Sequence, residues 1–262
     1  MDIIPQDDRK YNKDKFFNAT WVKYSNGDLE VCIFKKARKK HDLGGRNDME
    51  KTDEKKELYR YQARMRAGST VRKLVKENNL CYHWTLTYAE NMEDRTRAVR
   101  DFKTFVQRLN YRARTPTIPK VPYVAVMERQ KRGAIHFHFA TSVYIDVHML
   151  EAAWGHGFVK VEKHSGELDK VSGYLSKYLK KEMEKQDING EKQKLYFNSK
   201  GLKRPAKGNV CLSDEKARDV AARADVRVAV SDEYGTYGEA ISGRACHKRI
   251  GCCVDHHELP AY

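Results

Sequence analysis

The sequence predicts an α+β protein in which an antiparallel β-sheet is flanked by helices. First, β-rich and amphipathic helical segments alternate in the order β-α-β-β-α-β-α between residues 81 and 185. Second, a short turn at 130–133 joins two of the predicted strands, and a connection this short makes neighbouring strands antiparallel. Third, hydrophobic residues make up 40% of the chain, which is enough to bury a core between a sheet and its helices.

The first predicted element is a β-hairpin at Trp21–Phe34. Its two apolar-rich arms are separated by a turn at Ser25–Asp28, and the Asn-Gly pair within that turn is a strong hairpin signal. The charged stretch 35–56 contains two adjacent glycines and is predicted to be a loop. A helix is then predicted at 57–78, with Gly68-Ser69 as a potential break.

The central part of the chain carries the clearest periodicity. Strands are predicted at 81–88, 121–127, 135–143 and 157–162. Helices are predicted at 94–112, from a cap at Asp146 to Trp154, and at 168–185. The helix at 94–112 has one apolar stripe, made of Val99, Phe102, Phe105, Val106 and Leu109. A last helix is predicted from Ser213 to about Ala224.

Three segments follow from this organisation. Residues 1–78 are predicted to form an N-terminal hairpin and a charged helical extension, and residues 79–210 the central domain. Residues 211–262 are predicted to be a helical tail that carries Cys and His residues. The Cys and His residues between Cys246 and His257 are either a zinc cluster or a reduced, metal-free tail, and their spacing matches no common zinc finger or ribbon.

The charge balance favours a nucleic-acid partner. Lys and Arg outnumber Asp and Glu by 51 to 36, which gives a formal net charge of +15. A surplus of this size indicates a polyanion, because phosphates that are bound by Lys and Arg release their counterions. The alternative is a basic protein that has no such partner.

Several other function classes are disfavoured. No segment approaches the roughly 18–20 apolar residues that span a bilayer, the N-terminus has no signal-peptide pattern, and the six cysteines form no spaced framework. A cytoplasmic protein with reduced thiols and no membrane partner is therefore expected. Residues 45–52 resemble a phosphate-binding loop, but Glu50 stands where the second glycine is required. We therefore expect no built-in helicase, so that a host helicase would act in trans.

Glu128, His136 and His138 form the candidate metal site. Successive side chains of a strand alternate between its faces, so the two histidines share one face. Glu128 lies across the predicted hairpin and can supply an oxygen ligand. Two imidazoles and one carboxylate leave positions for a substrate phosphate and water, and they suit Mn²⁺ or Mg²⁺ better than zinc. The alternative is a pair of surface histidines on a half-exposed strand.

Tyr174 and Tyr178 are the candidate nucleophiles. They are four residues apart and therefore lie on one face of the predicted helix, and Lys177 and Lys181 each follow one of them by three residues. A phenol with a pKa of about 10 is a poor nucleophile until its phenolate is stabilised. A nearby metal ion and lysines provide that stabilisation. The alternative is that both tyrosines belong to the apolar stripe by which the helix packs on the sheet.

Basic residues lie next to the metal candidate. Arg129, Lys131 and Arg132 are predicted to contact phosphate, and a merely solvated turn is the alternative. A rival class is a non-catalytic binder, because the strand that follows loosely echoes the RNA-recognition strand of an RRM-like sheet. Ala134 and His136 occupy two of its three aromatic positions, which disfavours base stacking. A metal-dependent nicking assay separates the two classes.

These residues resemble the HUH endonucleases, named for a His–hydrophobic–His motif, and most closely the rolling-circle replication initiators of small phages and bacterial plasmids. Residues 84–88 are similar to the family's first strand motif, 128–138 to its metal motif and 173–181 to its nucleophile helix. Residues 197–205 resemble a segment of the filamentous-phage and plasmid branch. The family fold, a ferredoxin-like antiparallel sheet flanked by helices, agrees with the predicted elements.

The resemblance implies an enzyme that recognises double-strand origin DNA in a bacterial host cell, nicks one strand and later rejoins it. Cleavage in the family leaves a 5′-phosphotyrosine bond and a free 3′-OH on single-stranded DNA. Two-tyrosine members use both tyrosines in turn, and single-tyrosine plasmid initiators use the later position, which implies initial cleavage by Tyr178 and second transfer by Tyr174. A transposase or conjugative relaxase of the same superfamily is the alternative, and the double tyrosine and residues 197–205 favour replication.

Overall fold

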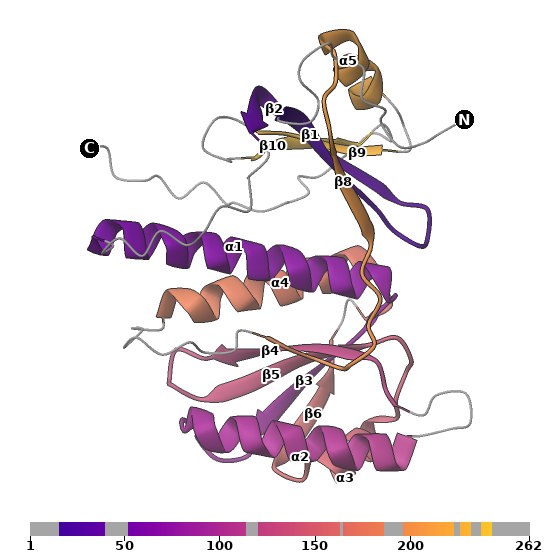
Figure 1. Cartoon of the computed structure of the whole chain (residues 1–262). Helices are drawn as coiled ribbons and strands as arrows, with labels where there is room; N and C mark the ends of the chain where they lie inside the picture. The colour runs from indigo at the N-terminus through magenta and orange to yellow at the C-terminus, as the bar shows by residue number, and fades with distance from the viewer. Residues whose placement is uncertain are drawn as a thin grey trace. The chain divides into compact units, whose positions relative to one another are not determined.

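A computed structural model describes residues 16–39, 52–113, 120–162, 165–185, 196–222, 226–231 and 237–242 (Figure 1). The chain divides into two compact units. One comprises residues 51–204, and the other comprises residues 1–50 together with 205–262. The α+β class predicted from the sequence is confirmed, because the described residues form two β-sheets and five helices.

The unit 51–204 is built on a five-stranded antiparallel sheet with the order β6-β3-β5-β4-β7. Its strands are β3 (Tyr82–Tyr88), β4 (Tyr123–Arg129), β5 (Ile135–Thr141), β6 (Gly157–Val161) and β7 (Tyr196–Asn198). The first four confirm the predicted strands with shifts of one or two residues at their ends. The three-residue strand β7 was not predicted, because it is too short for any periodicity to show.

Helices cover both faces of this sheet (Figure 1). On one face lie α2 (Arg95–Ala113) and α3 (Val147–Trp154), and on the other lie α1 (Asp53–Glu77) and α4 (Leu168–Lys185). The predicted apolar stripe of α2 is confirmed, since Phe102, Phe105 and Leu109 are all buried. Phe102 stacks on Phe137 of β5 with ring centroids 4.6 Å apart. The alternation of each strand therefore fills two separate hydrophobic cores.

The short helix α3 begins and ends where the sequence predicts. The Asp146 side chain accepts hydrogen bonds from the backbone N–H groups of His148 and Met149, which satisfies donors that have no partner within the helix. Gly155 follows the last turn with φ of 67°, a left-handed conformation that glycine adopts without steric cost. The predicted cap at Asp146 is thus confirmed.

Helix α1 is continuous, so the predicted break at Gly68-Ser69 is wrong. The cost of a glycine inside a helix, about 1 kcal/mol, is offset by packing against α4. The Ser176 hydroxyl donates a hydrogen bond to the Gly68 carbonyl across this contact. Lys76 is buried and its ammonium lies 3.3 Å from the Asp169 carboxylate. α1 therefore belongs to the same compact unit as the central sheet.

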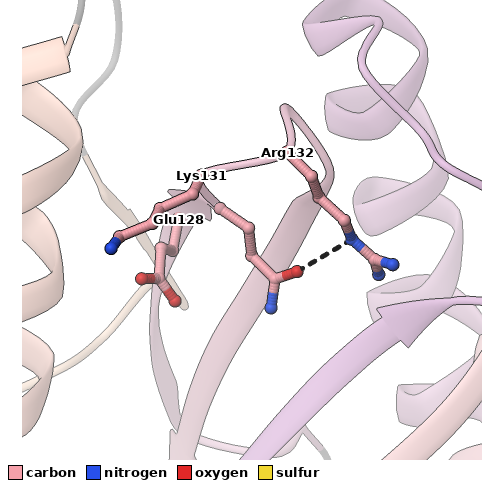
Figure 2. A pocket seen from close by; sticks show the side chains of 4 residues that line it. Glu128, Lys131 and Arg132 are labelled. Carbon is pink, nitrogen blue, oxygen red and sulfur yellow. Dashed lines mark hydrogen bonds between the residues drawn. The ribbon is translucent and has the colours of Figure 1, made fainter.

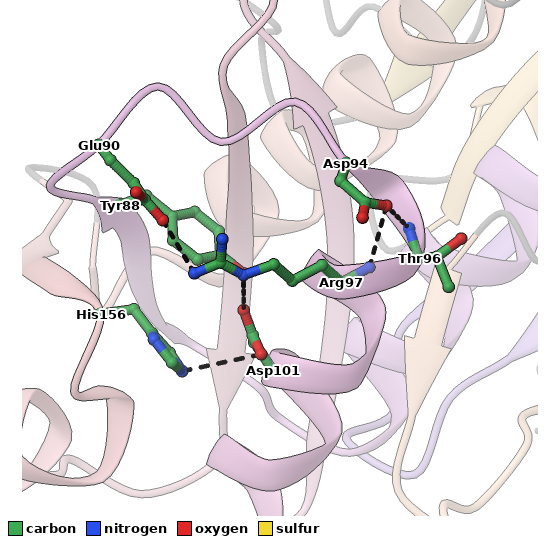
Figure 3. Close-up of polar contacts among 7 residues, drawn as sticks. All are labelled: Tyr88, Glu90, Asp94, Thr96, Arg97, Asp101 and His156. Carbon is green, nitrogen blue, oxygen red and sulfur yellow. Dashed lines mark hydrogen bonds and ion pairs between the residues drawn. The ribbon is translucent and has the colours of Figure 1, made fainter.

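A polar cluster ties β3 to α2 on the face opposite α4 (Figure 3). The Tyr88 hydroxyl donates to the Asp101 carboxylate at 3.1 Å, and burial followed by the charge of Asp101 raises the pKa of Tyr88. Arg97 lies 2.9 Å from Glu90 and 3.9 Å from Asp101, and His156 lies 4.0 Å from Asp101. These contacts fix the end of β3 against the helix, and so fix where its other side chains point.

The second unit contains a five-stranded sheet with the order β10-β9-β2-β1-β8. Its elements are β1 (Phe16–Lys23), β2 (Leu29–Lys39), β8 (Ala206–Val210), α5 (Asp214–Ala222), β9 (Val226–Ser231) and β10 (Tyr237–Ser242). The predicted hairpin and C-terminal helix are confirmed. β2 continues to Lys39, so the loop predicted at 35–56 was wrong for its first five residues.

The long-range pairings of this unit were not predicted. β1 pairs with β8, and the Asn18 side chain exchanges two hydrogen bonds with the Leu212 backbone, 194 residues away. The N-terminal hairpin and residues after 205 therefore share one sheet. The division into functional domains at residues 78 and 210 stays a prediction. The Cys and His residues between Cys246 and His257 lie outside the described residues.

No helix in the described part of the chain has the length and hydrophobicity needed to cross a membrane.

Candidate metal and nucleophile site

The candidate site lies on the face of the sheet that α4 partly covers. Strand register places Thr87, His136 and Glu128 in one row across β3, β5 and β4. The neighbouring row contains Thr85 and His138. The two histidines therefore share a face with Glu128, as the sequence predicted, and Ile135, Phe137 and Phe139 fill the core on the other face.

The three candidate ligands are buried and close together. His138 Nε2 lies 2.8 Å from Glu128 Oε2. Glu128, His136 and His138 are exposed by only 6%, 7% and 3% respectively, so the alternative of two surface histidines on a half-exposed strand is wrong. A carboxylate removed from water to this extent requires a charged or hydrogen-bonding partner.

Two threonines of β3 contact the histidines that face them. Thr85 Oγ1 lies 3.1 Å from His138 Nδ1, and Thr87 Oγ1 lies 3.3 Å from His136 Nδ1. In both rings the Nδ1 edge is therefore held by β3, and Nε2 is presented on the other side of the ring. The Thr85 hydroxyl also donates to Glu162 Oε1 at 2.5 Å.

This hydrogen-bond chain fixes the protonation of the His138 ring. A hydroxyl has one hydrogen to donate, and Thr85 gives it to Glu162. His138 Nδ1 must then carry the hydrogen of its bond to Thr85. In that tautomer Nε2 presents a lone pair to the Glu128 carboxylate at 2.8 Å. Two acceptors at this distance need a shared proton or a cation between them.

The donor set fits a divalent ion on this ground. Two ligands at right angles around an octahedral ion, each about 2.1 Å from it, lie about 3 Å apart, close to the observed separation of 2.8 Å. Within the described ranges, no group of three or more His, Cys, Asp or Glu side chains is already arranged around a common centre. His136 would have to turn toward the Glu128–His138 pair to complete such a set. The assignment of the three ligands stays a prediction.

The β4–β5 turn extends the site outward. Glu128, Gln130, Lys131 and Arg132 line a pocket at the end of the hairpin (Figure 2). Arg132 Nε donates to Gln130 Oε1 at 3.2 Å, and Gln130 Nε2 lies 3.5 Å from His136 Nδ1. Burial lowers the pKa of His136, and neighbouring His138 adds to the effect. A neutral imidazole is the form that binds metal ions.

The Tyr178 ring lies directly on the candidate metal site. It is stacked on the His138 ring with centroids 3.5 Å apart and planes 7° from parallel. Burial, followed by the charges of Glu128 and Glu162, raises the pKa of Tyr178 to about 12. The protein side chains alone therefore make this phenol less acidic than usual. A bound cation would oppose the effect of the carboxylates, because the charge of an ion dominates its surroundings.

Tyr174 lies one helical turn away and is more exposed. Its ring centroid is 6.2 Å from that of Tyr178, and 42% of its surface is accessible. The apolar stripe of α4 that packs on the sheet consists of Val171, Leu175 and Leu179, which are buried. Tyr174 thus lies beside this stripe and not within it.

The structure brings together most of the predicted site residues, but not all. Lys131 and Arg132 are exposed beside Glu128, and Lys177 is exposed on α4. Arg129 lies on the opposite face of the sheet, where its guanidinium donates to the backbone carbonyls of Gly133 and Glu93. The side chain of Lys181 lies outside the described residues.

The comparison with protein families bears on the same part of the chain. Residues 81–183 match the family model of the replication-associated protein ORF2. The match covers about two fifths of the chain and contains every candidate ligand and both tyrosines. It is consistent with a replication initiator family. No significant match was found among the curated proteins or among the solved structures.

The sequence analysis did not assign a role to Thr85, Thr87 or Glu162. A signal for the threonines was present, because Thr85 and Thr87 alternate along β3 as His136 and His138 alternate along β5. Their contact with the histidines depends on the pairing register of two distant strands, which no local pattern reveals. Glu162 reaches the site because β6 pairs with the other edge of β3.

Replacing Thr85 with valine is expected to weaken Mn²⁺ binding by roughly 10- to 100-fold, the range found when outer partners of metal-binding histidines are removed. Valine keeps the shape of threonine but cannot hold the hydrogen on His138 Nδ1. Calorimetric titration with Mn²⁺ measures the change. Thr85→Ser restores affinity, and Thr70→Val, which removes a hydroxyl from α1, leaves it unchanged. Unchanged Mn²⁺ affinity in Thr85→Val would show that the threonine has no part in the site.

Proposed function

We propose that this protein initiates rolling-circle replication by nicking one DNA strand at an origin and rejoining it through a tyrosine. The observation that supports the proposal most is the stacking of Tyr178 on His138, which brings the candidate nucleophile into contact with the candidate metal ligands. The family match of residues 81–183 to replication-associated proteins supports the same conclusion.

In the proposed cleavage the Tyr178 oxygen forms a bond to the scissile phosphorus, while the bond from phosphorus to the 3′ oxygen breaks. The tyrosine gives up its proton, and the leaving oxygen takes one up to become a free 3′-OH. The product is a 5′-phosphotyrosine bond. Because this ester replaces one phosphate ester with another, rejoining needs no nucleotide cofactor.

The residues around Tyr178 are suited to separate tasks. Thr85 and Glu162 hold the His138 ring in the tautomer that presents Nε2, and Thr87 holds the His136 ring. Glu128, His136 and His138 would hold Mn²⁺ or Mg²⁺, which when bound supplies positive charge for the phosphate and for the phenolate. The stacked His138 ring limits the orientations open to Tyr178.

Tyr174 is proposed to accept the strand in the second transfer. Its exposure leaves it accessible to a DNA end while Tyr178 carries the first covalent bond. The centroid separation of 6.2 Å keeps both tyrosines near the same phosphate position. Lys177 and Lys181 are proposed to support the charge that develops there. A host helicase in trans would open the duplex, since this chain carries no complete phosphate-binding loop motif.

The proposal is tested by incubating the protein with labelled single-stranded origin DNA and Mn²⁺. A covalent protein–DNA adduct that forms with Mn²⁺ and fails to form in chelator is the expected result. Binding of the DNA without any adduct would instead support a non-catalytic nucleic-acid-binding protein.

DNA affinity is expected to fall steeply with salt, because the net charge of +15 indicates binding through phosphates. Each phosphate contact to a single strand contributes about −0.7 to the slope of log affinity against log salt concentration. Lys131→Ala should make this slope less negative by about that amount, whereas Lys103→Ala on the α2 face should not. Fluorescence anisotropy titrations at several salt concentrations give the slopes. A flat response in the unsubstituted protein would contradict binding through phosphates.

A further inference from the structure

The edge strand β6 carries two exposed side chains on the face of the candidate site. Side chains alternate along β6, and Val159 points into the core that contains Trp154. Phe158 and Lys160 therefore point to the other face, the one that carries His136 and His138. The accessible fraction is 67% for Phe158 and 68% for the Lys160 side chain.

Strand register aligns these two residues with the site. Thr87 pairs with Phe158 on one side and with His136 on the other. Thr85 pairs in the same way with Lys160 and His138. Two rows thus run across the sheet from the exposed edge to the candidate metal ligands. Two strand spacings, about 10 Å, separate Phe158 from His136 along its row.

The exposure of Phe158 is not explained by packing within the described part of the chain. α4 packs chiefly over β4, while β6 lies at the far edge of the same sheet. A phenylalanine in this position exposes the flat face of its ring next to a lysine. Lys160 lies 3.9 Å from Glu162, a distance too long for a hydrogen bond, so most of its ammonium surface faces solvent.

We propose that Phe158 and Lys160 form a subsite for a nucleotide that flanks the reacting phosphate in single-stranded DNA. A nucleobase stacks on the Phe158 ring, and Lys160 contacts the adjoining phosphate. An aromatic ring beside a cation is the combination by which proteins hold single strands with little sequence preference. The position of the reacting phosphate rests on the proposed function, whereas the stacking surface itself does not.

A single-stranded nucleic acid suits this surface better than a protein partner. One phenylalanine flanked by a charged lysine provides far less apolar area than the roughly 800 Å² per partner of a stable protein interface. A nucleobase needs only one ring face and brings the phosphate that complements Lys160. The positive net charge of the chain favours the same ligand.

The test uses the full chain in chelator, so that binding is measured without cleavage. The probe is a single-stranded oligonucleotide of alternating 2-aminopurine and deoxythymidine, about 16 nucleotides long. Phe158→Ala should lower its affinity roughly tenfold and reduce the quenching of 2-aminopurine that stacking causes. Phe158→Trp should keep both. Tyr111→Ala, which removes an aromatic ring that is 75% exposed on α2, should change neither.

The outcomes separate the subsite from the enzymatic function. If the unsubstituted protein forms a DNA adduct but Phe158→Ala binds and quenches normally, the subsite is wrong and the function stands. If no adduct forms but quenching depends on Phe158, the subsite stands and the function is wrong. Failure of the unsubstituted protein to quench the probe overturns the subsite. It is also overturned if Phe158→Ala abolishes self-association in sedimentation while DNA affinity is unchanged, because a second copy would then be the occupant.

Discussion

A His138→Ala variant is expected to bind no measurable Mn²⁺ and to lose covalent adduct formation by more than about 100-fold, the upper range for removal of a mere outer partner. His138 contacts Glu128, Thr85 and the Tyr178 ring, so its loss removes a candidate ligand and the surface on which Tyr178 stacks. Calorimetry with Mn²⁺ and a gel assay for the adduct measure the two effects.

The same variant should remain folded, although less stable. It loses hydrogen bonds to a buried carboxylate and to a hydroxyl, which costs about 1–3 kcal/mol of unfolding free energy. His148→Ala is the matched control, because the His148 side chain is 90% exposed on α3 across the sheet. Thermal unfolding followed by circular dichroism distinguishes loss of the site from loss of the fold. Full adduct formation by His138→Ala in chelator would exclude the metal site.

Replacing Tyr178 with phenylalanine is expected to reduce the initial adduct by roughly 10⁴-fold or more, the scale seen when a covalent nucleophile is removed. The substitution deletes only the hydroxyl, so the ring can still stack on His138. Unfolding free energy should therefore change by no more than about 0.5 kcal/mol. Rapid-quench sampling of the labelled adduct measures the rate.

Tyr174→Phe should leave the first cleavage intact and slow the second strand transfer. Tyr111→Phe, on the opposite helix layer, controls for loss of a hydroxyl far from the site. Equal losses of the first cleavage in Tyr174→Phe and Tyr178→Phe would show that the two tyrosines do not act in the proposed order.

Local sequence patterns were sufficient to predict most of the unit that carries the site. Period-two alternation predicted β3, β4, β5 and β6, and it placed His136 and His138 on one face together. The same rule would have assigned Arg129 to the opposite face, because it directly follows Glu128 on the same strand. Its proximity in sequence to the metal motif outweighed that argument.

The remaining features depend on pairings between distant strands. The contacts of Thr85 with His138 and Glu162 require β3 to lie between β5 and β6 in one particular register. The sheet of the second unit pairs residues near 20 with residues near 210. The propensity of Gly68 to interrupt a helix was overridden by the packing of α1 on α4. None of these outcomes is encoded within a single segment.

The central claim is that Tyr178 forms the first covalent bond to DNA beside the His138 ring. Trapping the adduct with labelled single-stranded origin DNA and Mn²⁺, followed by proteolysis and mass spectrometry of the DNA-linked peptide, tests it most directly. The account predicts the DNA mass on Tyr178 after the first cleavage. DNA on Tyr174 alone would reverse the order of the tyrosines, and DNA on neither tyrosine would contradict the mechanism.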